Sequence, residues 1–225
     1  FKTIYASSRV RINKVLTQNC YSEVEKMIST YGIFGTLKMI LFFIKTKFLF
    51  PKARLIRFPI DVRNKKNIDF GENLTTGVGC RLESCPQTMT DSKLLKFGNN
   101  IQLNDYVHIT AAHSVEIGNN VLMASKIYIS DCTHGSYIGN EYDSDPMSLP
   151  IDRPLSVKAV KIEDNVWLGE FVSVLPGVTI GKGTIVGANS VVSKSLPPYV
   201  IAVGSPAKPI KFYNFESKRW EKYVN

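Results

Sequence analysis

Aliphatic residues recur at every sixth position over a long stretch of this chain. Counting in sixes from Ile162 gives a series that is aliphatic throughout: Ile162, Leu168, Val174, Ile180, Val186 and Val192. An α-helix places apolar residues three or four positions apart and a half-buried strand alternates them by two, so a period of six fits neither element alone. It is typical of a parallel β-helix, in which three hexads form one triangular coil and one aliphatic residue of each hexad points inward.

The same period extends toward the N-terminus. The series continues through Phe97, Leu103 and Ile109 and, after a shift of two residues, through Ile117, Met123 and Ile129. A weaker run indicates that coils begin near residue 60: Val62, Ile68, Leu74 and Cys80. Gly and Asn recur where a coil must turn, because these residues adopt tight or positive-φ conformations at low cost. We therefore predict an all-β fold, with a β-helix domain over residues 56–195.

The frame breaks between Ile129 and Ile162. The segment "GSYIGNEYDSDPMSLPIDRPLSV" is rich in Gly, Ser, Asp and Pro, which predicts one long loop thrown out of the coil at about residues 135–156. Long loops in compact domains commonly carry function, although an inert insertion is the alternative. After the repeat, Pro197 and Pro198 stop the pattern, and residues 196–225 are expected to form a basic, partly apolar tail.

Residues 1–55 are expected to form a basic, partly helical N-terminal segment. The run from Ile33 to Phe50 is the most apolar in the chain, but Lys38, Lys45 and Lys47 interrupt it. A central Lys costs about 3 kcal/mol on insertion scales, which disfavours a membrane-spanning helix. We expect instead an amphipathic helix, which either packs on the protein's own core or contacts an anionic membrane surface through residues 33–57.

The net charge of +9 on 225 residues predicts an anionic partner, which the charge alone does not identify. Nucleic acid is not expected, because no recognised motif and no basic face interleaved with aromatic residues is present. The four cysteines lack CxxC spacing and a His-rich companion, so neither a zinc site nor a disulfide framework is indicated. A reducing, cytoplasmic setting fits this cysteine usage.

Two quoted stretches carry a family resemblance. They are "ISDCTHGSY" and "NVWLGEFVSVLPGVTIGKGTIVGANSVVSKSLPPYVIAVGSPAKPIK", and the likeness extends over about residues 52–212. The chain resembles the hexapeptide-repeat acetyltransferases, which include galactoside and maltose acetyltransferases, and resembles bacterial capsule, lipopolysaccharide and colanic-acid sugar O-acetyltransferases still more strongly. The resemblance implies a left-handed coil, a homotrimer, and transfer of acetyl from acetyl-CoA to a hydroxyl of a surface saccharide or its precursor.

Acetyl transfer to a sugar hydroxyl requires a base, and a His with a pKa near its ordinary value of about 6.5 suits that role at neutral pH. His134 is the candidate, because it closes the last hexad before the loop and ends an "I-x-D-x-x-H-G" pattern that matches the family's catalytic histidine. Asp131 is expected to orient the imidazole or to stabilise the imidazolium, although a carboxylate at a turn also commonly caps local backbone. His108 and His113 are expected to be structural.

Cys132 offers a competing covalent route, since "DCTH" places a thiol two residues from His134. The resemblance favours direct transfer, because many relatives carry another residue at this position.

The resemblance also assigns the binding positions. It places the backbone around Trp167 at the thioester, where a donor would stabilise the oxyanion, and Gly169 in the pantetheine channel. Three further positions match contacts to the pantetheine arm: Glu170, Ala188 and Ser193. Three match the nucleotide end: Lys194, Lys208 and Lys211. Relatives commonly carry Ser or Ala where this chain has Glu170, which puts that contact in doubt.

Four loop residues are expected to shape the acceptor site: Tyr142, Asp143, Asp145 and Arg153. No His and carboxylate cluster has metal-ligand spacing, so no catalytic metal is predicted. Two other readings stay open at this stage. One is an acetyltransferase of the same fold that acts on another small acceptor, such as an antibiotic or serine, and the other is a non-catalytic β-helix binding module.

Overall fold

The computed structural model describes the backbone of residues 2–224 and the side chains of residues 25–224. The chain divides into two compact units, Phe1–Lys45 and Thr46–Asn225. The second unit contains all the strands of the described residues. Its helical segments are the short 3-10 turns η1 (Lys65–Asn67) and η2 (Pro150–Asp152) and the last residues of helix α1.

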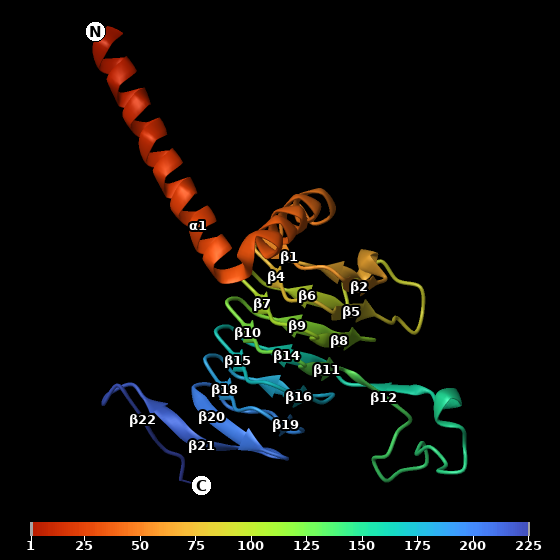
Figure 1. Ribbon diagram of the computed structural model, residues 1–225. Helices are drawn as coiled ribbons and strands as arrows, with labels where there is room; N and C mark the ends of the chain where they lie inside the picture. The colour runs from red at the N-terminus through yellow and green to blue at the C-terminus, as the bar shows by residue number, and fades with distance from the viewer. Residues whose placement is uncertain (1, 225) are drawn as a thin grey trace. The chain divides into compact units, whose positions relative to one another are not determined.

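Three parallel sheets form the faces of a triangular prism (Figure 1). The first face contains β1 (Leu55–Ile56), β4 (Thr75–Thr76), β7 (Gln102–Leu103), β10 (Leu122–Met123), β15 (Trp167–Leu168), β18 (Ile185–Val186) and β20 (Val200–Gly204). The second contains β2 (Ile60–Arg63), β5 (Cys80–Ser84), β8 (His108–Ala111), β11 (Tyr128–Ser130), β16 (Ser173–Val174) and β19 (Val191–Val192). The third contains β3 (Ile68–Asp69), β6 (Leu95–Phe97), β9 (Val115–Ile117), β14 (Val160–Ile162) and β17 (Thr179–Ile180).

The six-residue series forms the core of this prism, as predicted. Each inward residue pairs with its equivalent one coil away. On the first face the paired residues run in order through Leu103, Met123, Leu168 and Val186. All of them are at most 1% exposed, so each coil covers the apolar floor of the next.

The N-terminal coils differ in frame from the prediction. Leu74 and Cys80 are buried, but the residues that pair with the inward positions of neighbouring coils are Thr76, opposite Ile56, and Leu82, opposite Val62. Leu74 and Cys80 therefore belong to the core, but the paired ladder residues lie two positions after each of them. The shift lies between β2 and β3, because Phe70, whose ring stacks on Phe97 of the next coil, follows Val62 by eight positions instead of six. A two-residue shift leaves the alternation of buried positions intact, which hides it from a periodicity count.

One corner of the prism is built from stacked asparagines. Asn100, Asn120 and Asn165 each adopt a positive φ of 56–59°, and their side chains donate to one another from coil to coil at 3.1 Å. Each is the fourth residue of its unit, in "FGNNIQ", "IGNNVL" and "IEDNVW". The left-handed backbone conformation explains why Asn recurs there, because Asn tolerates it better than other residues with a Cβ.

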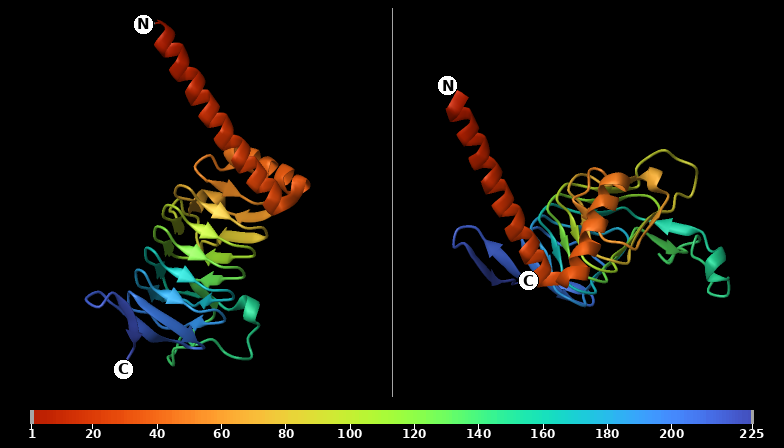
Figure 2. Two further views of the ribbon diagram at one scale, coloured as in Figure 1. Left: turned by 60° about the vertical axis from the view of Figure 1, so that its left-hand side comes forward. Right: turned by 45° about the horizontal axis from the view of Figure 1, so that its top comes forward.

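Two insertions leave the regular coils on the side of the second face. Residues 85–94 connect β5 to β6 as a loop. Further along, β12 (Cys132–His134) and β13 (Leu155–Val157) pair antiparallel as a two-stranded sheet of their own, and the connecting residues include η2. Figures 1 and 2 show this hairpin projecting from the prism between β11 and β14.

The C-terminal residues continue the first face. Strand β20 pairs parallel with β18, and then β21 (Ala207–Asn214) and β22 (Arg219–Lys222) add two antiparallel strands.

Helix α1 (Lys2–Leu49) is interrupted at Gly32, whose φ of 68° and ψ of 174° are not helical. The portion Glu25–Leu49, with a mean hydropathy of 1.6, is long and apolar enough to cross a membrane. Helices buried in soluble proteins and signal sequences satisfy the same criterion, so this finding alone is weak evidence of a membrane span.

Candidate active site

His134 ends strand β12, at the root of the projecting hairpin. It pairs with Leu155 of β13, and its side chain is exposed. The carbonyl oxygen of His134 accepts a hydrogen bond from the Tyr137 hydroxyl at 2.6 Å, and Arg153 Nη1 donates to that hydroxyl oxygen at 2.8 Å. The backbone that carries the imidazole is thus held on both sides, while the ring remains accessible to a substrate.

The Asp131 side chain is fully buried, and its carboxylate accepts three backbone N–H groups, from Ala112 at 2.8 Å, His113 at 2.7 Å and Ser114 at 2.6 Å. Within the described residues it makes no hydrogen bond to His134. Both carboxylate oxygens fix the 112–114 turn of the preceding coil, which is the backbone-capping alternative to an orienting role.

The Cys132 thiol lies beside the Ser130 hydroxyl, with Sγ and Oγ 3.4 Å apart. Burial raises the pKa of the Cys132 thiol, so less of it is thiolate at neutral pH. Since the thiolate is the nucleophile, this environment disfavours an acyl-cysteine intermediate.

Three of the four loop residues predicted to shape the acceptor site are engaged within the loop itself. The Asp143 carboxylate accepts the backbone N–H groups of residues 138 and 139, and Asp145 accepts that of residue 147. Arg153 donates to the side chain and carbonyl of Ser148. Tyr142 is 76% exposed, and Asp143 and Asp145 are exposed as well.

Three of the residues predicted to bind the cofactor lie on the sheet of the first face: Trp167, Lys208 and Lys211. Outward residues on consecutive strands are in register here: Leu122, Trp167, Ile185, Ile201 and Lys211. Trp167 is 48% exposed, which fits a contact surface better than a packed core. Lys208 lies on the same strand as Lys211, opposite Val203.

The corner that follows the first face brings together Gly169, Glu170 and Ala188. A Cβ on Gly169 would lie 2.7 Å from the backbone nitrogen of Ala188, so only Gly allows this close approach of two coils. The Glu170 carbonyl accepts the N–H of Asn189 at 2.8 Å. Ser193 and Lys194 are exposed but follow β19, at a different corner.

The backbone around Trp167 cannot supply the oxyanion donors that were expected there. The N–H of Trp167 donates to the Thr184 carbonyl at 3.0 Å, and the N–H of Gly169 donates to the Val186 carbonyl at 2.8 Å. Both are committed to the sheet. The predicted contribution of Trp167 to the thioester site therefore rests on its exposed indole and not on these two N–H groups.

His134 and the Trp167 surface lie on different sides of the prism. The hairpin projects beside the second face, whereas the first face, with β15, β18 and β20, forms the opposite side in every view (Figures 1 and 2). A single chain therefore separates the predicted base from most of the predicted cofactor-binding residues.

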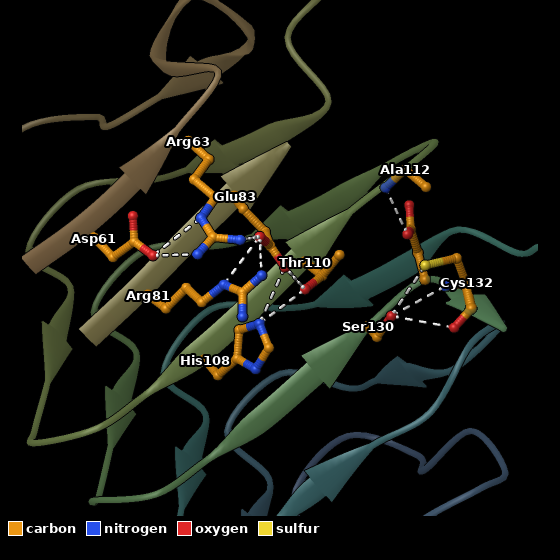
Figure 3. Close-up of polar contacts among 10 residues, drawn as sticks. Asp61, Arg63, Arg81, Glu83, His108, Thr110, Ala112, Ser130 and Cys132 are labelled. Carbon is orange, nitrogen blue, oxygen red and sulfur yellow. Dashed lines mark hydrogen bonds and ion pairs between the residues drawn. The ribbon is translucent and has the colours of Figure 1, made fainter. Parts of the chain in front are cut away.

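A cluster around Glu83 was not singled out from the sequence. Figure 3 shows Glu83 on the outside of the second face, between two arginines and a histidine. Its carboxylate accepts hydrogen bonds from Arg81 at 2.6 and 2.9 Å and from Thr110 at 2.8 Å, and His108 Nε2 lies 3.2 Å from Oε1. The signal in the sequence was weak, because three partners of Glu83 lie 20–27 residues away on other coils and all are common surface residues.

Opposing effects set the ionisation of Glu83. Burial alone raises the pKa of its carboxyl group, but the hydrogen bonds from Thr110, Arg81 and His108 outweigh burial and hold the pKa below its ordinary value. Because Glu83 and its partners come from three successive coils, the cluster ties those coils together on the outer face.

Stacked hexapeptide coils interrupted by one hairpin with an exposed histidine define a hexapeptide transferase. A family model described as "Bacterial transferase hexapeptide (six repeats)" matches residues 159–194. A protein of Escherichia coli (strain K12) named "Putative lipopolysaccharide biosynthesis O-acetyl transferase WbbJ" is 45% identical over 197 residues, which cover 88% of this chain and 98% of that protein. The chain therefore belongs to the hexapeptide-repeat acetyltransferase family.

More distant relatives agree with this assignment. The galactoside O-acetyltransferase of E. coli (strain K12) is 33% identical over 126 residues, covering 56% of this chain and 58% of that enzyme. Among solved structures, the N-acyltransferase AntD of Bacillus cereus superposes with a TM-score of 0.59 at 22% identity, over 74% of this chain and 83% of that one. This likeness concerns the fold. Family and fold together imply a left-handed β-helix.

Proposed function

We propose that this chain transfers an acetyl group from acetyl-CoA to a hydroxyl of a bacterial surface polysaccharide or of its precursor. The observation that carries the proposal is the likeness to the E. coli protein named for lipopolysaccharide O-acetylation, which extends over nearly the whole of both chains. The galactoside O-acetyltransferase supports an O-linked sugar acceptor. The solved AntD complex contains coenzyme A and a sugar nucleotide, which supports the donor and a saccharide acceptor.

In the proposed reaction His134 acts as the general base. Its imidazole takes the proton of the acceptor hydroxyl as the oxygen attacks the thioester carbonyl. The tetrahedral intermediate then collapses, the C–S bond breaks, and the imidazolium returns the proton to the sulfur of coenzyme A. The accessible ring on a strand whose backbone is fixed by Tyr137 and Arg153 suits this role.

Direct transfer is preferred to an acyl-cysteine route. The raised pKa of the Cys132 thiol argues against its use as the nucleophile, and Ser130 already contacts its sulfur. A sugar hydroxyl activated by His134 needs no covalent intermediate on the protein.

The proposed assembly is a homotrimer in which sites form between copies. His134 and the Trp167 surface lie on different sides of one chain, and a neighbouring copy would supply the missing half of each site. The pantetheine arm would lie over Gly169 and Ala188, where the corner lacks bulky side chains, and Lys208 and Lys211 would approach its phosphates. Ser193 and Lys194 are proposed to contact the same ligand from the next corner. Glu170 is the least favourable member, because its carboxylate would repel a phosphate.

The N-terminal segment is proposed to hold the enzyme at the inner face of the membrane in the cytoplasm. Residues 33–57 combine apolar side chains with basic ones, and anionic lipid attracts such segments. Flotation of the full chain with liposomes containing anionic lipid should recover it with the vesicles. Recovery only in the protein fraction would contradict the proposal.

Release of free coenzyme A from acetyl-CoA, measured against a panel of capsular and lipopolysaccharide sugars, tests the function. We expect His134→Ala to lower kcat by about 10²- to 10⁴-fold, which is the usual contribution of a general base. The matched change Cys132→Ser should retain most of the activity. Loss of activity in Cys132→Ser with full retention in His134→Ala would reverse the two roles, and a wild-type protein inert on every acceptor would remove the proposal.

A further inference from the structure

A cavity of about 460 Å³ lies between the 85–94 loop and the 112–114 turn, and the reaction described above does not use it. Its size falls in the range of small-molecule sites, about 300–1,000 Å³. Residues of the 85–94 loop, residues of the 112–114 turn and Val157 of β13 line the cavity. The loop is an insertion between β5 and β6, so the hexad pattern does not require it.

Both walls are fixed rather than loosely attached. The buried Asn67 side chain donates to the carbonyl oxygens of Thr90 and Ser92 at 2.7 and 2.9 Å, which holds the middle of the loop. The Asp131 carboxylate holds the 112–114 turn through three backbone N–H groups. Binding to a preformed site costs less free energy, because fewer side chains and loop residues have to be ordered when the ligand binds.

The cavity adjoins the strand pair that carries the proposed base. The side chain of Gln87, which lines the cavity, donates to the Leu155 carbonyl oxygen at 3.0 Å. Leu155 is the cross-strand partner of His134, and paired Cα atoms in an antiparallel sheet lie about 4.5–5.5 Å apart. A ligand in the cavity therefore lies close to the strand pair that carries the imidazole, on the same chain.

The lining selects for a polar and negatively charged ligand. Hydroxyl side chains of the loop and Ser114, the Gln87 amide and the His113 imidazole offer hydrogen bonds, and no acidic residue occurs among the described residues that line the cavity. Lys96 is paired with Glu116 at 2.9 Å, but Lys93 forms no ion pair within the described residues and donates only to the Lys66 carbonyl oxygen. The Lys93 ammonium retains further donors, which an oxyanion would accept.

We infer that this cavity is an acceptor subsite that binds a sugar unit bearing an oxyanion, a carboxylate or a phosphate, next to the unit whose hydroxyl is acetylated. The inference rests on the proposed function, because it assigns the acceptor of that same reaction. Lys93 contacts the anionic group, and the hydroxyl and amide side chains contact the ring. The carboxylate of an acidic polysaccharide and the phosphate of a nucleotide-linked precursor share this chemistry.

Kinetic measurements with three acceptors distinguish recognition of a carboxylate from recognition of a phosphate. They are a neutral glucose disaccharide, a disaccharide containing glucuronic acid, and UDP-glucose, each assayed by coenzyme A release with wild type, Lys93→Ala and Lys93→Arg. We expect Lys93→Ala to raise KM about tenfold or more for one or both anionic acceptors and less than about twofold for the neutral one, with kcat little changed. Lys93→Arg should recover most of the affinity. Lys222→Ala, which removes an exposed lysine from β22, is the matched control and should change neither constant.

Binding measurements with a variant that lacks the proposed base test the subsite independently of the reaction. Isothermal titration of the three saccharides into full-length His134→Ala and His134→Ala/Lys93→Ala should show binding of an anionic saccharide that depends on Lys93. If the wild type is inert on every acceptor but this binding persists, the proposed function fails and the subsite stands. Equal KM changes for neutral and anionic acceptors, unchanged KM in Lys93→Ala, or no binding of either anionic saccharide would overturn the inference.

Discussion

Asp131 shows how a residue can serve a site without touching the reacting atoms. Its buried carboxylate holds the 112–114 turn, and its own backbone carbonyl accepts the N–H of Lys158 at 2.8 Å. It is therefore connected to the coil before the hairpin and to the strand that leaves the hairpin. Only two residues separate it from His134, so a displacement of Asp131 would move the base.

We expect Asp131→Ala to destabilise the protein by about 1–3 kcal/mol, because it leaves three backbone N–H groups without their acceptor, and that of Ala112 is buried. The activity that remains should show a lowered kcat with little change in KM for acetyl-CoA, whose proposed site lies on another face. Thermal unfolding and coenzyme A release measure the two effects. Asp69→Asn is the control, since Asp69 accepts one exposed backbone N–H at 3.1 Å. An unchanged Tm in Asp131→Ala would contradict the anchoring role.

Glu83 gives the stability of the fold a dependence on pH. Its carboxyl pKa is lower in the folded chain than the ordinary value, so the cluster stabilises the protein fully above the ordinary carboxyl pKa of about 4.3. This contribution is lost as pH falls through the lower, folded-state pKa.

Glu83→Gln should lower the free energy of unfolding at pH 7 by about 1–3 kcal/mol, less than for a fully buried ion pair because both arginines stay partly solvated. The difference in Tm between variant and wild type should shrink as the pH is lowered below the ordinary carboxyl pKa of about 4.3, because protonation of Glu83, first in the unfolded and then in the folded chain, removes the contribution of the ionised form. A difference that stays constant across this range would show that the ionised state of Glu83 contributes nothing.

At the scale of the element, each short strand depends on its inward side chains. Ile162 on β14 is fully buried and stacks between Ile117 and Ile180, whereas its neighbour Lys161 points outward. We expect Ile162→Ala to cost about 2–5 kcal/mol, the usual range for a large-to-small change in a core. Lys161→Ala should cost less than about 1 kcal/mol, because its pairing with Glu163 at 3.5 Å is exposed. Chemical denaturation measures the free energy of unfolding of both variants. Similar losses in the two variants would contradict the conclusion that the inward residues stabilise the stacked coils.

The inward positions were predictable because burial on one face repeats with the coil. Ile162 to Val192 follow strictly from the period of six, and the asparagine corner follows from the φ that a turn requires. The two-residue shift of the ladder between β2 and β3 was not predictable in this way. The length of a corner depends on how two coils stack and not on local sequence alone.

The candidate site was predictable only in part for the same reason. His134 was found because a local motif surrounds it. The contacts of Asp131 and Glu83 reach back one coil, across 17–27 residues, and so depend on the register between coils. The 85–94 loop carries no motif, and its relation to Leu155 appears only once β13 is placed beside β12.

At the scale of the whole molecule, the separation of the two predicted half-sites within one chain constrains how the enzyme can assemble. The hairpin with His134 and the first face with Trp167 project to different sides of the prism. Each is exposed in a single copy, and exposed catalytic groups gain little from the low dielectric of a closed site. A closed ring of copies would bring each hairpin against the first face of a neighbour, because such a contact repeats around a symmetry axis.

Mixing two inactive variants tests this arrangement. His134→Ala removes the base, and Ala188→Trp places a bulky side chain on the exposed corner where the pantetheine arm is proposed to lie. If each site takes its base from one copy and its cofactor surface from the next, random assembly of equal amounts restores about one quarter of the sites, since each half is intact with a probability of about one half. Coenzyme A release from the co-refolded mixture should therefore reach about a quarter of the wild-type rate, while each variant alone stays inactive. Activity no greater than the mean of the two separate variants would place both halves of the site on one chain.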